Sequence, residues 1–374
     1  MSQYLSFMFS LLALILSLRA EAEPSAGRDC IVHSDGRKDI AQSFHQSQEK
    51  PVRDFFEQHD SSKGDGALRR PKELINTTCL VASLRRTVGR QGGFSCAAPD
   101  GSGASANNSA RSLPGGKQCI TSDMLRYIQS SLSSAMNCVS EASRIPVDAA
   151  TTYQKINNES AFQFYHSNSG GTGIGQLTSW PLRDMFQARP GLYADTLSKI
   201  ESLPQCSPFK AIVESDRQLS GAALFPRQRM CRYLSPGEGF QRNLLYSMVF
   251  MSQLKKRILN LLPQNFLQGS SGRDIEKQKR ILLIERLALV GYGPEGMARA
   301  QGLARSLRFG SEFNVDTALR RVTGGSSYLR AMDSKSREAL RTTSFKDVSE
   351  CVVPGLGPSS RPPSTSPLPA AGRS

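Results

Sequence analysis

Apolar residues recur at helical spacing along several long segments of this chain, and this periodicity most constrains its fold. The clearest segment covers residues 240–262, where large apolar side chains form one broad stripe and Pro263 follows as a stop signal. The same spacing predicts helices over 72–90, 122–141, 147–158 and 274–289, and the start of another over 180–187. A stripe that contains methionines, as this one does, is typical of a protein core. The sequence therefore predicts a mainly α-helical fold.

One polar stretch, residues 157–178, follows a predicted helix. It places a single carboxylic acid, Glu159, near the C-terminal end of the helix predicted over 147–158, and a Ser- and Gly-rich turn comes next. The closely spaced glycines between positions 170 and 175 predict a β-hairpin whose backbone approaches a ligand or another segment. Taken alone, a glutamate at a helix end is most often a solvated surface residue, and a Gly-rich hairpin has no required function.

The two parts of this stretch together resemble the lytic transglycosylases and goose-type lysozymes. The first motif of that family, Glu-Ser-x-Phe, is matched by Glu-Ser-Ala-Phe at 159–162. The second, Ser-x-x-Gly-x-x-Gly-Leu-Met-Gln-Leu, is matched over 167–177, with Ile174 and Gly175 in place of Leu and Met. A family helix begins near an asparagine, here Asn243. The tyrosine of a later Ala-Tyr-Asn-Ala-Gly-Pro motif is matched by Tyr292, although the Asn-Ala pair is missing. The resemblance covers roughly residues 120–310.

This resemblance implies a lysozyme-like helical domain (mainly α, in the α+β class) with a small β-hairpin at an active-site cleft. It implies that Glu159 is the general acid and base that cleaves the MurNAc-GlcNAc β-1,4 bond of peptidoglycan glycan strands. The polar groups expected around the N-acetyl group and the sugar ring are Ser167, Gln176 and Tyr292.

The choice between two reactions depends on a second carboxylate. An ordinary glycosidase uses two, whereas the transglycosylases of the family let the 6-hydroxyl of the substrate attack. Asp184 is the nearest downstream acid, and we expect it to be a surface charge or a helix-start contact. We therefore expect transglycosylation to a 1,6-anhydromuramyl product, with lysozyme-type hydrolysis and non-catalytic glycan binding as the alternatives.

The chain has eight cysteines and no C-x-x-C pair. An even count in an exported chain favours disulfides over zinc sites. Spacing does not fix the connectivity, but pairing of neighbours would join Cys79 to Cys96, Cys119 to Cys138 and Cys206 to Cys231, and leave Cys30 with Cys351. The four histidines lack metal-ligand spacing, so we expect no metal and no cofactor.

The remaining segments predict an exported protein with extensions at both ends. An apolar run over 5–18 and a small-x-small site at 20–22 indicate a signal peptide over 1–22, with an uncleaved membrane anchor as the alternative. An N-terminal extension with a flexible loop (23–118) and the catalytic domain (119–310) follow. The domain contains an irregular, disulfide-bound insertion over 188–238. A C-terminal helical extension (311–353) and a disordered Pro- and Ser-rich tail (354–374) complete the chain.

A formal charge of +15 points to an anionic partner. Nucleic acid is not expected, because the chain has only one tryptophan and no basic stripe interleaved with aromatic residues. An anionic cell wall fits an exported, periplasmic or secreted protein better, although dispersed surface charge also serves solubility alone. We expect a monomer that is not stably inserted in a membrane after signal cleavage.

Overall fold

A computed structural model of the protein describes residues 74–88, 122–162, 167–168, 171–218, 238–267, 274–310 and 313–353. The predicted signal peptide and the predicted C-terminal tail lie outside these residues, as do Cys30, Cys96, Cys119 and Cys231. Within the described part the protein is mainly α-helical, which confirms the prediction from apolar periodicity. No helix in these ranges is both long enough and apolar enough to cross a bilayer.

The helices of the described part are α3 (Thr77–Val88), α4 (Ser122–Ser143), α5 (Ala149–Glu159), α6 (Ser179–Arg183), α7 (Ala194–Ser202), α8 (Ser207–Gln218), α9 (Glu238–Leu259), α10 (Asp274–Tyr292), α11 (Gly296–Arg305), α12 (Val315–Gly324) and α13 (Ser327–Leu340). Shorter helical turns are η5 (Asp184–Ala188), a π-helix, and the 3₁₀ turns η6 (Pro190–Leu192), η7 (Pro204–Cys206) and η10 (Val348–Cys351). Two two-residue strands, β1 (Ser167–Asn168) and β2 (Gly171–Thr172), pair antiparallel. The helices predicted over 72–90, 122–141, 147–158, 240–262 and 274–289 correspond to α3, α4, α5, α9 and α10.

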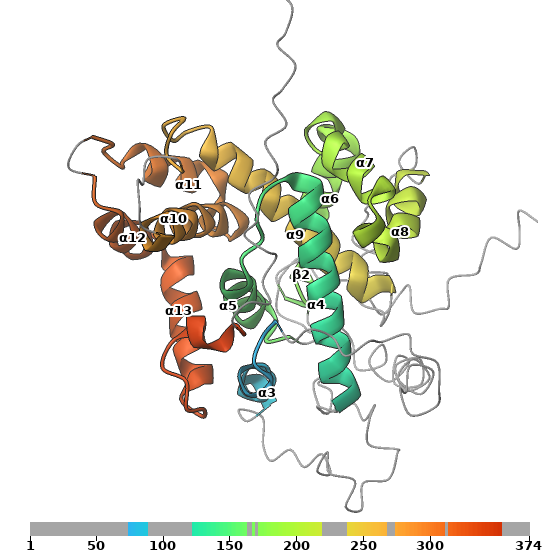
Figure 1. The fold of residues 1–374 in the computed structure, drawn as a ribbon, viewed down its shortest axis with the longest axis horizontal. Helices are drawn as coiled ribbons and strands as arrows, with labels where there is room; N and C mark the ends of the chain where they lie inside the picture. Colours follow the sequence, from blue (N-terminus) through green and yellow to red (C-terminus); the bar gives the residue numbers. More distant parts are fainter. Residues whose placement is uncertain are drawn as a thin grey trace, which may run out of the picture.

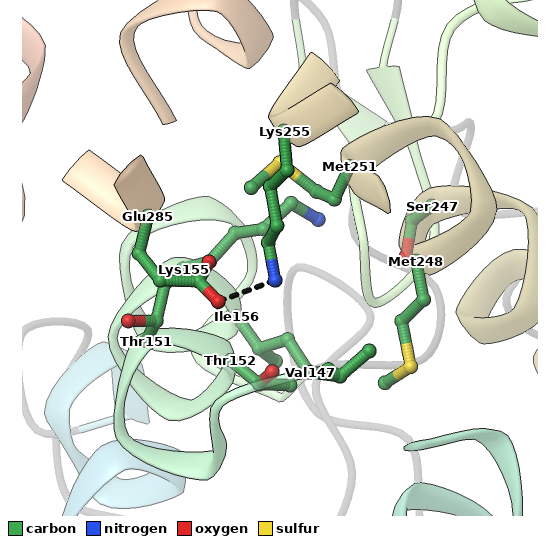
Figure 2. Close-up of a pocket in the computed structure, with 10 residues that line it drawn as sticks. All are labelled: Val147, Thr151, Thr152, Lys155, Ile156, Ser247, Met248, Met251, Lys255 and Glu285. Atoms are coloured by element: carbon green, nitrogen blue, oxygen red, sulfur yellow. Dashed lines mark hydrogen bonds and ion pairs between the residues drawn. The ribbon is translucent and has the colours of Figure 1, made fainter. Parts of the chain in front are cut away.

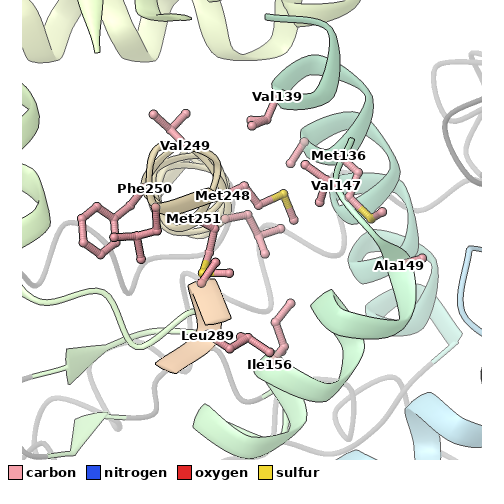
Figure 3. Packing of buried hydrophobic residues seen from close by; sticks show 14 of the residues in the cluster. Met136, Val139, Val147, Ala149, Ile156, Met248, Val249, Phe250, Met251 and Leu289 are labelled. Carbon is pink, nitrogen blue, oxygen red and sulfur yellow. The ribbon is translucent and has the colours of Figure 1, made fainter. Parts of the chain in front are cut away.

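Helix α9 lies at the centre of the domain, between α4 and α10 (Figure 1). Figure 3 shows it end-on, with Met136 and Val139 of α4 to one side and Leu289 of α10 below it. Both methionines on this face, Met248 and Met251, are buried, so the stripe is core. Burying each such side chain contributes about 1.5–3 kcal/mol. The core therefore fixes α9 against the helices that carry the polar residues described below.

The prediction that residues 188–238 are irregular is wrong for the described part of that segment. Helices α7 and α8 pack against each other, and α7 also packs on α4. The prolines that suggested irregular structure stand at helix starts: Pro204 begins η7 and Pro208 lies in the first turn of α8. A proline is tolerated there because the first N–H groups of a helix have no intrahelical partner.

In the described part of the chain, two disulfides join elements that are distant in the sequence. Cys138 of α4 bonds to Cys206 of η7, and Cys79 of α3 bonds to Cys351 of η10. Pairing of sequence neighbours is therefore wrong for these four cysteines, because the bonds follow the packing of helices in space. The Cys79–Cys351 bond closes a separation of 272 residues. Disulfides of this kind are typical of proteins from oxidising compartments.

Candidate active site

Helix α5 carries Glu159 as its last residue. Asp148 caps the other end with its carboxylate, so the helix has a defined start. Beyond Glu159 the backbone reverses through positive φ angles of 48° at Ala161 and 62° at Phe162. These angles are uncommon for residues other than glycine. The buried ring of Phe162 packs on Tyr153, with ring centroids 5.7 Å apart, and this packing holds the reversal in place. The half-buried Glu159 side chain is thus fixed at a sharp corner of the chain.

A tight turn over residues 173–176 lies against this end of α5. The hydroxyl of Ser160 donates a hydrogen bond to the carbonyl oxygen of Ile174 at 2.7 Å, which joins the corner to the turn. Gly175 is packed so closely that a Cβ atom there would lie 2.8 Å from the Cβ of Ser247 on α9. Real Cβ contacts are not that short, so this position requires glycine.

Side chains from three helices hold the peptide groups of Gly175. Its N–H donates to Oδ1 of Asn243 on α9 at 2.7 Å, and Asn243 is fully buried. Its carbonyl oxygen accepts a hydrogen bond from the Tyr292 hydroxyl on α10 at 2.7 Å. The same carbonyl accepts one from Nζ of Lys155 on α5 at 3.3 Å. Side chains therefore bind both the N–H and the carbonyl oxygen of Gly175, and this fixes the turn.

Tyr328 of α13 completes the surroundings of Glu159. Its hydroxyl donates a hydrogen bond to Oε1 of Glu159. Its backbone N–H donates to Oε1 of Glu295 at 2.8 Å, which anchors the start of α13. Its ring lies so close to Gly293 that a Cβ atom there would be 2.7 Å from the ring. The packing of the Tyr328 ring and the hydrogen bond of its backbone N–H thus hold its hydroxyl within hydrogen-bonding distance of the Glu159 carboxylate.

Both phenols near Glu159 remain donors at neutral pH. Burial, and then the negative charge of Glu159, raise the pKa of Tyr292 well above its usual range. The same two causes, in the same order, raise the pKa of Tyr328. Since a deprotonated phenol would place a second negative charge beside the carboxylate, the protonated forms are favoured. The site therefore offers a carboxyl group surrounded by protonated hydroxyl donors.

The structure brings only some of the predicted site residues to Glu159. Tyr292 lies near it, within range of its charge, and is hydrogen-bonded to the turn. Gln176 is buried in the turn, where its Nε2 donates to the carbonyl of Gly173 at 2.9 Å. Ser167 pairs with Thr172 through its backbone, and its side chain lies outside what the structure describes. Their roles in binding a substrate stay predictions.

Asp184 is not a surface charge, so that alternative is wrong; it is the first residue of η5 and thus stands at a helix start, the other alternative. Its side chain is only 2% exposed, and its carboxylate accepts hydrogen bonds from Nε of Arg189 and, at 2.8 Å, from the hydroxyl of Tyr193. Arg257 lies 3.6 Å from the same group. Burial together with the bond to Asp184 raises the pKa of Tyr193 above its usual range. The Asp184 carboxylate is therefore part of a buried polar network with Arg189, Tyr193 and Arg257.

Two side chains at this site, Lys155 and Tyr328, are not among the residues predicted from the sequence. Lys155 stands four residues before Glu159, and residues at that spacing share one face of a helix. That spacing was a usable signal. Tyr328 had none, because it belongs to a helix far along the chain that only the tertiary fold brings to Glu159.

A large exposed aromatic side chain, Trp180, lies at the start of α6, just after the turn. It is 52% exposed and packs edge-on against Phe250 of α9, with centroids 5.6 Å apart. Phe250 in turn contacts the ring of Tyr292 at 5.7 Å. A continuous row of rings thus connects the surface with the tyrosine that holds Gly175.

The chemistry available here is proton transfer and hydrogen bonding by organic side chains. Among the described residues no group of three or more His, Cys, Asp or Glu side chains could hold a metal ion.

No protein-family model, curated protein or solved structure matches the chain.

Proposed function

We propose that the protein is a lytic transglycosylase that cleaves the MurNAc-GlcNAc β-1,4 bond of peptidoglycan, with Glu159 as general acid and then general base. One observation carries the proposal. The carboxyl group of Glu159, at the end of a helix that is joined to a clamped, glycine-lined turn, receives a hydrogen bond from Tyr328. Cleavage of a glycosidic bond requires a proton on the leaving oxygen, and one positioned carboxylic acid can supply it.

Transglycosylation is favoured over hydrolysis by the groups that contact Glu159. Two carboxyl groups act in an ordinary glycosidase. Three side chains interact with Glu159 by hydrogen bonding or charge, and all are cationic or phenolic: Lys155, Tyr292 and Tyr328. Asp184, the sequence candidate for a second acid, is committed to Arg189 and Tyr193. In the proposed reaction Glu159 gives its proton to the leaving oxygen, which departs as an alcohol. The Glu159 carboxylate then accepts the proton of the 6-hydroxyl as that oxygen attacks the anomeric carbon.

We also propose a fold type and a cellular location for this enzyme. The helical domain is lysozyme-like, and the β1–β2 segment is the small hairpin at the active-site cleft. Export through the N-terminal signal peptide brings the enzyme to the periplasm or the exterior, where the two disulfides are stable and the basic chain meets the anionic cell wall.

Substitution of Glu159 by Gln tests this function, because Gln keeps the volume of the side chain but has no proton to transfer. Placed acids contribute about 10²–10⁴-fold to rate. We expect the variant to lose at least that much of the release of soluble muropeptides from purified sacculi while it still folds and binds them. The exposed Glu141 of α4 provides a matched control, since Glu141→Gln should digest at the wild-type rate. Wild-type digestion by Glu159→Gln would overturn the assignment of Glu159 as the catalytic acid. A wild-type protein that binds sacculi and releases no muropeptides would instead favour a non-catalytic glycan-binding protein.

A further inference from the structure

Lys155 is a buried cation that contacts two uncharged groups of the site. It is only 4% exposed. Its ammonium group contacts the carbonyl oxygen of Gly175 at 3.3 Å and lies 3.9 Å from the centroid of the Tyr292 ring. A carbonyl and an aromatic face attract a cation, but neither carries a full negative charge. Burying a charge with such partners is costly, and an apolar chain of the same length would fill the space at lower cost.

The ammonium group lies one helical turn before Glu159. Burial lowers the pKa of Lys155 to about 8, and the nearby charge of Glu159 acts in the opposite direction. The two side chains therefore interact electrostatically on one face of α5. Glu159 is also the last residue of its helix, where the backbone carries a partial negative charge. A cation one turn back offsets that charge.

The other ionisable groups near Lys155 have partners of their own. Lys255 of α9 and Glu285 of α10 share a small cavity of about 20 Å³ with Lys155, and Figure 2 shows these two paired to each other. On α13, Tyr328 contacts Glu159, and Nζ of Lys335 donates to the carbonyl of Asn158 at 2.9 Å. Among these groups, Glu159 is therefore the carboxylate with which Lys155 interacts electrostatically.

We propose that Lys155 is a positioning residue of the active site, whose ammonium group fixes Gly175 and Tyr292 and stabilises the negative charge that forms on Glu159 when it gives up its proton. This inference rests on the proposed function and adds a residue to it. Lys155 does not touch the reacting atoms. It acts through two contacts with the turn and one electrostatic interaction with the acid. Preorganised charges aimed at a developing charge are among the largest contributions to catalysis.

The test is the Lys155→Met variant, which keeps the length of the side chain and removes its charge. Turnover on sacculi is measured from pH 5 to pH 10, together with equilibrium unfolding over the same range. We expect kcat to fall about tenfold at pH 6–7, with KM changed by less than twofold. The wild-type kcat should decline through about pH 8, as Lys155 loses its proton, and this decline should be absent in the variant. Lys279→Met, the same change at a half-exposed ion pair with Asp316, is the matched control and should follow the wild type.

The equilibrium unfolding measurement distinguishes a lysine that acts in catalysis from one that only stabilises the fold. Because the pKa of Lys155 is lower in the folded state than the ordinary value of 10.5, its charge disfavours folding below about pH 8. The Met variant should therefore unfold at higher denaturant concentration than the wild type at pH 6–7, and this advantage should shrink between pH 8 and pH 10.5.

A variant that is less stable, or fails to fold, would overturn the proposal. So would a stable variant with wild-type kcat and the same decline above pH 8. A wild-type protein without activity on sacculi would instead overturn the proposed function and this inference together.

Discussion

Replacing Tyr328 by Phe removes the hydroxyl that donates to Glu159 and leaves the ring in place. The ring is held by packing against Gly293, and the backbone is held by Glu295, so the substitution should not displace α13. A hydrogen bond to a charged group contributes about 1.5–3 kcal/mol. If that contribution is realised on the carboxylate that forms in the transition state, kcat falls about 10–150-fold.

The assay is release of soluble muropeptides from sacculi, with thermal unfolding measured in parallel. The chain offers a matched control in Tyr193, whose hydroxyl also donates to a carboxylate, that of the buried Asp184. Tyr193→Phe should lower stability and leave kcat unchanged, whereas Tyr328→Phe should lower kcat. An unchanged kcat in Tyr328→Phe, or equal losses of kcat in both variants, would refute the idea that this phenol acts on Glu159.

Two further predictions concern stability. Replacing both Cys79 and Cys351 by Ser should lower the free energy of unfolding by about 2–5 kcal/mol, because the bond restricts the unfolded chain over a separation of 272 residues; equal denaturation midpoints with and without the bond would contradict this. Burial raises the pKa of Glu285 to about 7 from its ordinary 4.5, even beside Lys255. The folded state therefore holds this proton more tightly, and stability should fall as pH rises from about 4.5 to 7. Glu285→Gln should flatten that part of the profile, and an unchanged slope would exclude Glu285 as its source.

Periodicity predicted α4, α9 and α10 because the apolar stripes of amphipathic helices are local properties of the sequence. It failed for α7 and α8, where the prolines at 204 and 208 looked like breaks but stand at helix starts. The disulfides could not be predicted, since the spatial neighbours of Cys79 and Cys138 depend on how distant helices pack.

The candidate site was predictable only where its residues lie close together in the sequence. Glu159 and the glycine-rich turn are neighbours along the chain, so one stretch of sequence carried both. Asn243 and Tyr292 were identified through the family resemblance, and the structure brings both to Gly175. Tyr328 lies in the segment that the sequence predicts to be an extension beyond the catalytic domain, and no local pattern links it to Glu159. Asp184 is buried because its partners Arg189 and Tyr193 come after the π-helical turn η5, and no sequence pattern indicated that turn.

The central claim is that one carboxylic acid, Glu159, works without a second carboxylate. Mass spectrometry of the muropeptides that the wild-type protein releases from sacculi tests it most directly. Transglycosylation predicts 1,6-anhydromuramyl ends, which are lighter than the hydrolysed ends by one water. Products that carry only hydrolysed, reducing ends would contradict the account, since attack by water would then require a second group to activate it.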